Sequence, residues 1–147
     1  MSSLIDAYLE YETETVVREM TAYDRERLIE WIDGICQKFG AAHYPPEMIP
    51  YTGLAVRRGS VTLAVGLLCL EQSSRLAVFG FCVSNPRMRG KTTADAVKRI
   101  VSGMPEYARS KGACALMSCF GNIGINRLLD LAGYMNMELN ETKIIRL

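Results

Sequence analysis

The sequence is poor in the residues that build metal and disulfide sites. It has one histidine, His43, and no pair of cysteines in a CxxC pattern. A zinc site needs a set of Cys and His ligands at short spacings, so none can be assembled and we expect no metal. A lone histidine in a loop is expected to be exposed rather than catalytic. The cysteines stand mostly inside apolar segments and are predicted to be buried, reduced thiols: Cys36, Cys69, Cys82, Cys114 and Cys119.

The chain also lacks an excess of positive or negative charge, and it lacks long hydrophobic runs. The chain has 17 Lys and Arg against 16 Asp and Glu, a net charge of +1. Such a chain has no strong field to recruit nucleic acid or an acidic membrane, so any anion site must be local. No apolar run approaches the roughly 18 residues of a membrane span, and no basic segment followed by an apolar one opens the chain. We therefore expect a cytoplasmic protein with no nucleic-acid or membrane partner.

The length and composition are those of an ordinary globular domain. The chain has 147 residues, of which 49% are hydrophobic and 22% charged, and nothing in it indicates two domains. We expect a single domain over residues 14–147. Residues 1–13 show a short amphipathic pattern, which predicts an N-terminal helical extension or an arm that docks on a protein partner or a second copy.

Hydrophobic periodicity predicts the order of the elements. Helices are expected at 24–39, 92–107 and 121–132, and strands at 14–20, 52–58, 61–72, 76–83, 113–119 and 138–147, the last as a strand or hairpin. The three consecutive strands from 52 to 83 are expected to be antiparallel. Pro105 is expected to kink or restart its helix because it removes a backbone hydrogen bond.

One turn joins the apolar strand 76–83 to the following helix and is basic. Arg87, Arg89 and Lys91 supply positive charge, and Gly90 lets a ligand approach the backbone closely. Backbone N–H groups at a helix start lack intrahelical partners and can point at an anion. The turn therefore predicts a phosphate site; the alternative is a plain helix cap with solvated basic residues.

This layout resembles the GCN5-related N-acetyltransferase (GNAT) family. The resemblance implies an α/β (α+β) fold, with a central mixed, mostly antiparallel sheet flanked by helices on both faces. The acyl-CoA signature of that family is Arg or Gln, two residues, Gly, one residue, then Gly or Ala. It is matched here by Arg89, Gly90, Lys91 and Ala94, while Thr92 replaces the central glycine.

A second family motif lies in the last predicted helix. Asn122, Leu128, Gly133 and Tyr134 match it at the right spacing. Leu129 stands where many members have a tyrosine that protonates the departing CoA thiolate, and Ile125 replaces an alanine.

The resemblance implies an acyl-CoA-dependent N-acyltransferase that uses acetyl-CoA as co-substrate and a small-molecule amine or a protein as acceptor. The residues it implies for CoA binding are Phe81, Val83, Arg89, Gly90, Lys91, Thr92, Thr93, Ala94 and Asn122. No catalytic residue is identified, since the strand that leads to the turn has no acid. Glu71 is the nearest candidate base, and Cys82 or Ser84 is placed to touch a substrate or order a water.

A second hypothesis belongs to another class. A GNAT-like fold that has lost its chemistry would act as a binding or structural protein, such as a component of a phage particle. The amphipathic segment 1–13 favours this alternative, while Arg89, Gly90 and Lys91 favour the enzyme. Acceptor specificity would lie in variable loops such as 40–51, whose apolar rim suits an apolar acceptor or a protein partner.

Overall fold

The computed structural model describes residues 14–120, 123–136 and 142–147. The extension predicted over 1–13 and the predicted CoA-binding residue Asn122 lie outside the described residues. The described elements are β1 (Thr15–Glu19), α2 (Ala22–Phe39), the short 3-10 helix η1 (Pro46–Met48), β2 (Gly53–Arg58), β3 (Val61–Leu70), β4 (Leu76–Ser84), α3 (Lys91–Ser110), β5 (Ala115–Cys119), α4 (Ile123–Leu131), β6 (Met135–Asn136) and β7 (Thr142–Arg146). Their order agrees with the prediction, except that η1 and β6 were not expected.

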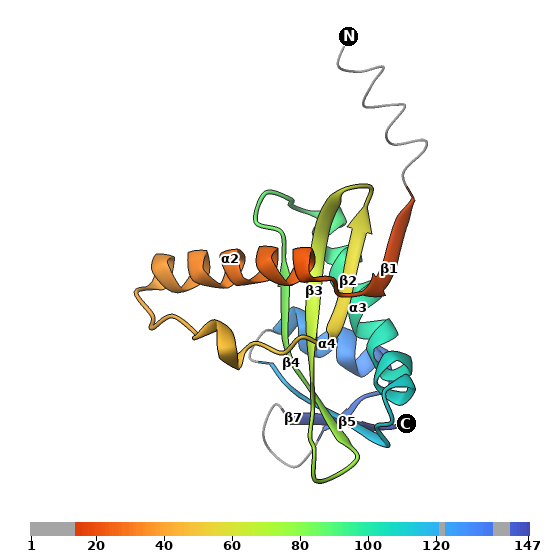
Figure 1. Cartoon of the computed structure of the whole chain (residues 1–147). Helices are drawn as coiled ribbons and strands as arrows, with labels where there is room; N and C mark the ends of the chain where they lie inside the picture. Colours follow the sequence, from red (N-terminus) through yellow and green to blue (C-terminus); the bar gives the residue numbers. More distant parts are fainter. Residues whose placement is uncertain (1–13, 121–122, 137–141) are drawn as a thin grey trace.

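The strands form one sheet in the order β1-β2-β3-β4-β5-β7-β6. Every neighbouring pair is antiparallel except β4 and β5, which run parallel. In Figure 1, α2 crosses one face of the sheet while α3 and α4 cover the other. The expected mixed, mostly antiparallel sheet with helices on both faces is therefore confirmed.

Helix α2 is fixed to the sheet by a buried carboxylate. Asp24 and Thr21 form a capping box at the start of the helix, in which each side chain accepts from the backbone N–H of the other residue. The second oxygen of Asp24 accepts a 2.7 Å bond from Thr62 Oγ1 of β3 and lies 3.7 Å from Arg57 of β2. Because Asp24 is fully buried, these polar contacts define where the first turn of α2 lies on the sheet.

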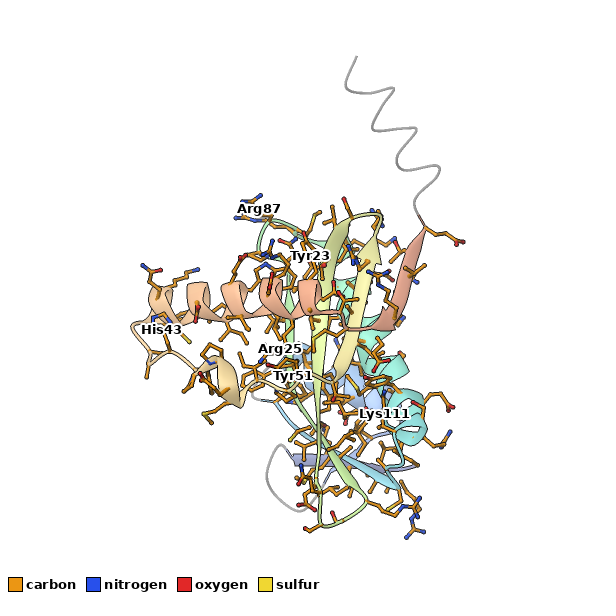
Figure 2. All side chains as sticks on the ribbon, viewed as in Figure 1. Tyr23, Arg25, His43, Tyr51, Arg87 and Lys111 are labelled. Atoms are coloured by element: carbon orange, nitrogen blue, oxygen red, sulfur yellow. The ribbon has the colours of Figure 1, made fainter. Side chains whose placement is uncertain are left out.

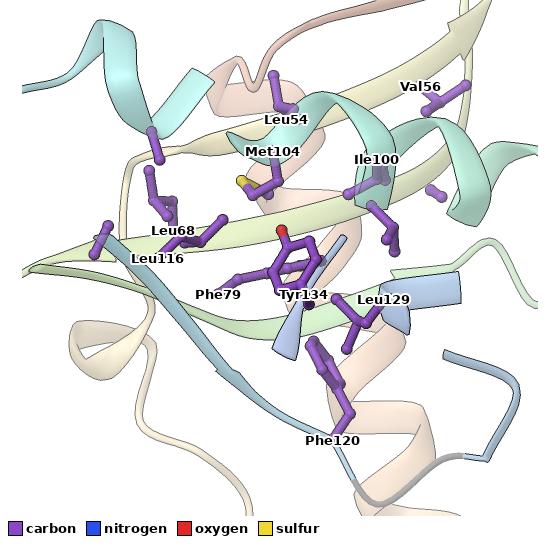
Figure 3. Packing of buried hydrophobic residues seen from close by; sticks show 14 of the residues in the cluster. Leu54, Val56, Leu68, Phe79, Ile100, Met104, Leu116, Phe120, Leu129 and Tyr134 are labelled. Atoms are coloured by element: carbon purple, nitrogen blue, oxygen red, sulfur yellow. The ribbon is translucent and has the colours of Figure 1, made fainter. Parts of the chain in front are cut away.

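Helix α3 packs closely on the opposite face. Its buried residues Ile100 and Met104 belong to one cluster with Phe79 of β4 (Figure 3). A Cβ at Gly66 of β3 would clash with the Ile100 side chain, so only glycine allows this approach. The helix runs unbroken through Pro105 to Ser110, and the expected restart is wrong because core packing on both sides of Pro105 outweighs one missing hydrogen bond.

The thiols differ from their predicted burial. Cys36 is buried and Cys82 half-buried, but Cys69 and Cys114 are exposed, and all these described thiols are free. Cys69 follows the buried stretch of β3, and Cys114 precedes β5. An apolar neighbourhood in the sequence did not imply burial at the ends of the strands.

Candidate functional site

The central strands separate at the middle of β4. The pairing of β4 with β5 ends at Phe79 opposite Ser118. The register of β4 against β3 shifts at the next residue, Gly80, which forms a β-bulge. A bulge bends its strand and increases the local twist. Beyond Phe79, the β5-facing edge of β4 has no partner among the described strands, so its backbone groups are available to a ligand.

The start of α3 lies directly beyond this open edge. Its N-cap is Gly90, with φ 69° and ψ −135° and no side-chain cap, and its first turn contains no acidic residue. An L-residue rarely adopts this backbone conformation, which explains the glycine. The first N–H groups of the helix and the positive end of its dipole are therefore left for an anion.

The turn that precedes α3 is held from behind by Asn85. Its side-chain oxygen accepts from the backbone N–H of Arg87 at 2.9 Å, and its Nδ2 donates to the carbonyl of Thr62 at 3.0 Å. Its own backbone N–H donates to Leu63 at 2.8 Å. Asn85 is a positioning residue that was not singled out from the sequence, although Asn before Pro is a common turn signal.

A pocket of about 600 Å³ opens among three elements: the end of β4, the first turns of α3, and α4. We call it the α3 pocket. It is lined by Cys82, Ser84, Lys91, Thr93, Ala94, Asp95, Val97, Lys98, Gly124, Ile125 and Leu128. Such a volume is typical of sites for small molecules and cofactors.

The polar groups of the α3 pocket favour an anion. Lys91 and Lys98 are exposed at its wall, while the carboxylate of Asp95 is held by Arg99 at 2.9 Å. The Thr93 hydroxyl is buried and has no hydrogen-bond partner among the described residues. A buried hydroxyl without a partner costs stability.

The sequence predicted part of this pocket. Lys91, Thr93 and Ala94 line it, while Arg89, Gly90 and Thr92 belong to the same turn and helix start without lining it. Two other predicted residues, Phe81 and Val83, pack against the cluster under α2, on the opposite face of the sheet. Their side chains therefore do not contribute to the α3 pocket, although their backbone lies on the open edge of β4.

Two charged residues of the wall, Asp95 and Lys98, were not predicted from the sequence. Lys91, Ala94, Asp95 and Lys98 follow the i, i+3, i+4, i+7 spacing of a single helix face. This spacing could have extended the predicted site beyond Ala94 by about one helical turn.

The candidate base Glu71 and Leu129, which stands at the position of the family's tyrosine, both lie away from the pocket. Glu71 lies beyond the far end of β3, where hydrogen bonds from Ser73 lower the pKa of its carboxyl. Glu71 therefore cannot serve as a base at the α3 pocket.

Leu129 is fully buried in the core cluster, and the wall that α4 contributes is apolar. His43 is exposed beside Asp33, as expected, at 3.2 Å.

Cys82 is placed in the pocket, but its thiol is not activated. Burial raises its pKa to about 12, so the nucleophilic thiolate is scarce at neutral pH. We expect an alkylating reagent to modify the exposed Cys69 and Cys114 at least about tenfold faster than Cys82. Mass spectrometry of peptides from a time course of iodoacetamide treatment measures these rates. Preferential labelling of Cys82 would contradict this assignment and would indicate a reactive thiol in the pocket.

Searches for related sequences and structures gave different results. No family model and no curated protein matches the sequence. Solved structures do match: a GNAT family acetyltransferase from Brucella melitensis in complex with acetyl-CoA is 11% identical, with a TM-score of 0.62 over 91% of this chain and 88% of that one. A GCN5-related N-acetyltransferase from Kribbella flavida is 13% identical, with a TM-score of 0.66 over 90% and 98%. A Bacillus subtilis acetyltransferase in complex with CoA is 12% identical, with a TM-score of 0.61 over 91% and 99%.

The chain thus has the fold of the GCN5-related N-acetyltransferases. The resemblance predicted from the sequence is confirmed at the level of this fold, at low sequence identity. Within residues 14–120, 123–136 and 142–147, no three His, Cys, Asp or Glu side chains are grouped to hold a metal ion. None of the helices described is both long and apolar enough to cross a membrane.

Proposed function

We propose that the protein is an acyl-CoA-dependent N-acyltransferase that transfers an acetyl group from acetyl-CoA to an amine. One observation carries the proposal: the uncapped, glycine-led start of α3 opens beside a mainly apolar pocket whose wall includes Thr93 and the exposed Lys91 and Lys98. Several of the solved structures that share the fold contain acetyl-CoA or CoA. The acceptor would be a small-molecule amine or a protein.

The residues present fit the parts of CoA. The pyrophosphate would lie at the start of α3, where Arg89 and Lys91 add charge to the free N–H groups. The pantetheine arm carries amides, which would pair with the open edge of β4 beyond Phe79 as a further strand would. Phe81 and Val83 would contribute through their backbone only, because their side chains face α2.

The reaction itself needs few groups from the protein. The amine lone pair attacks the thioester carbonyl, the C–S bond breaks, the ammonium loses a proton and the thiolate gains one. A thiol with a pKa near 8.5 is a good leaving group, so a missing acid slows the reaction without preventing it. Holding the two reactants in the correct geometry can contribute several kcal/mol. We assign no base or acid, and an ordered water is the simplest carrier of the proton.

The face of the sheet under α2 is the proposed approach of the acceptor. Phe81 of β4 packs edge-to-face with Tyr44 of the 40–51 loop, with ring centroids 5.3 Å apart. Met48 and Tyr51 of the same loop are strongly exposed, at 67% and 80%. These side chains make the approach apolar, which favours an acceptor with an apolar body beside its amine.

The proposal is tested by binding and turnover of the full chain. Calorimetric titration with acetyl-CoA and with CoA should give saturable binding, and release of free CoA should follow when aliphatic amines, aromatic amines and peptides are supplied. No binding at millimolar acetyl-CoA would overturn the proposal. Binding without acyl transfer to any amine would support the alternative of a binding protein; the structural neighbours give no support for a phage component.

Replacing Thr93 with valine should lower the affinity for CoA without lowering the free energy of unfolding. Valine has nearly the same shape but no hydroxyl, so the free energy of unfolding should stay the same or rise by up to about 1 kcal/mol. The proposal places the Thr93 hydroxyl, after a turn of its side chain, on a phosphate of CoA. The dissociation constant of CoA should then rise about tenfold or more, because that hydrogen bond to a charged group is lost. Chemical denaturation and calorimetry measure the two effects. Thr93→Ser keeps the hydroxyl and should retain most of the affinity; equal losses in both variants would show that the hydroxyl does not contact the ligand.

A further inference from the structure

A second cavity, of about 660 Å³, lies on the other side of the turn at residues 85–88. We call it the Trp31 pocket. Its walls come from the first half of α2, from the turn between β2 and β3, and from residues 85–88. It shares no lining residue with the α3 pocket, so the two cavities are separate sites. Figure 2 shows Tyr23 on α2 and Arg87 on the turn above that helix.

The side chains of this pocket combine aromatic surface with guanidinium groups. Tyr23 and Trp31 lie two turns apart on α2 and both line the pocket. The guanidiniums of Arg27 and Arg57 stand over the Tyr23 ring, 4.9 Å and 5.4 Å from its centroid. Guanidinium planes and aromatic rings both favour a flat ligand that can stack on them.

The charged side chains of the pocket wall differ in their pairing. Arg27 Nη2 lies 2.9 Å from Glu30 and 3.9 Å from Glu26, so the charge of Arg27 is compensated. The Arg87 guanidinium, by contrast, has no hydrogen bond or ion pair within the described part of the chain, and Arg87 is exposed. A carboxylate or phosphate group can accept two parallel bonds from a guanidinium.

The walls are fixed before any ligand arrives. Asp24 fixes the start of α2 through Thr62 and Arg57, and Arg57 also donates to the carbonyl of Ser60 at 3.2 Å. Asn85 holds the opposite wall on β3. A rigid cavity loses little entropy when a ligand binds, so such a site gains affinity from being formed in advance.

We propose that the Trp31 pocket binds a small aromatic anion. The ring would lie against Trp31 and Tyr23, and the carboxylate or phosphate would accept from Arg87. This site does not require acyl-CoA, so the proposal can be tested separately from the proposed acyltransferase activity.

The chain contains its own reporter, because Trp31 is its only tryptophan. The full chain is titrated with benzoate, phenyl phosphate, benzyl alcohol and benzylamine while the tryptophan fluorescence is followed, and calorimetry with benzoate gives an independent constant. The two anions should cause a saturable change with dissociation constants of about 1 mM or lower, and the neutral and cationic analogues should bind at least about tenfold more weakly. Equal responses to benzoate and benzylamine, or no saturable response to either anion, would overturn the proposal.

A pair of variants on the same turn locates the anion. Arg87→Gln should weaken benzoate and phenyl phosphate at least about tenfold, whereas Arg89→Gln, outside the Trp31 pocket, should leave both constants within about twofold. Both side chains are exposed, and circular dichroism checks that the variants fold. An unchanged constant in Arg87→Gln would contradict the site. A larger loss in Arg89→Gln would also contradict it, by placing the anion at the start of α3 instead.

Discussion

Reversing the charge of Arg89 and Lys91 together is expected to weaken CoA binding at least about 100-fold. Each side chain stands at the start of α3, where its charge adds to the helix dipole and to the uncapped N–H groups. A hydrogen bond to a charged group contributes about 1.5–3 kcal/mol, so losing two of them accounts for this factor before any repulsion is counted. Calorimetric titration of the Arg89→Glu/Lys91→Glu variant with CoA measures the loss.

The matched control is the variant Arg18→Glu/Arg146→Glu. Arg18 on β1 and Arg146 on β7 are exposed, and neither lines a pocket described above. The control changes the net charge by the same amount, so it removes any general electrostatic effect from the comparison. A similar loss of CoA affinity in both variants would show that the start of α3 is not the pyrophosphate site. Raising the salt concentration should weaken CoA binding by the unaltered chain more than by the Arg89→Glu/Lys91→Glu variant.

Replacing Gly90 with alanine is expected to impair the same site through the backbone. Gly90 has φ 69° and ψ −135°, while the space around its would-be Cβ is open. The cost is therefore conformational, and we expect the free energy of unfolding to fall by about 1–3 kcal/mol. If the turn relaxes to an allowed conformation, the N–H groups turn away, and the affinity for CoA should fall at least about tenfold. Urea denaturation and calorimetry report the two quantities.

Gly34 provides the control for this substitution. It lies inside α2, its would-be Cβ also meets open space, and its backbone is not left-handed. Gly34→Ala should raise the free energy of unfolding by about 0.5–1 kcal/mol and leave CoA binding unchanged. If Gly90→Ala behaved like Gly34→Ala, the conformation of Gly90 would not be required for the site.

Local patterns were enough to predict the elements and to single out the turn at which we propose an anion site. The apolar run of β4, the helical spacing of α3 and the basic glycine turn between them are each determined by neighbouring residues. The sequence therefore predicted the order of strands and helices and the GNAT fold, and it singled out Lys91, Thr93 and Ala94, which line the α3 pocket.

Properties that depend on register and on distant contacts could not be predicted. The bulge at Gly80 shifts the alternation of β4, so Phe81 and Val83 face α2 while Cys82 and Ser84 face the α3 pocket. A shift of one residue exchanges the two faces of a strand, and a single sequence does not show where it occurs. The distance of Glu71 from the pocket follows from the same antiparallel pairing of β3 and β4.

The sequence by itself determined the class of fold and the basic, glycine-led start of α3, because both depend on periodicity and on a few consecutive residues. Only the tertiary structure decided which side chains line each cavity, and that a second, separate cavity exists around Trp31. That cavity is built from α2, from the turn between β2 and β3, and from residues 85–88. These segments are far apart along the chain, and they meet only because sheet pairing and the buried carboxylate of Asp24 hold them together.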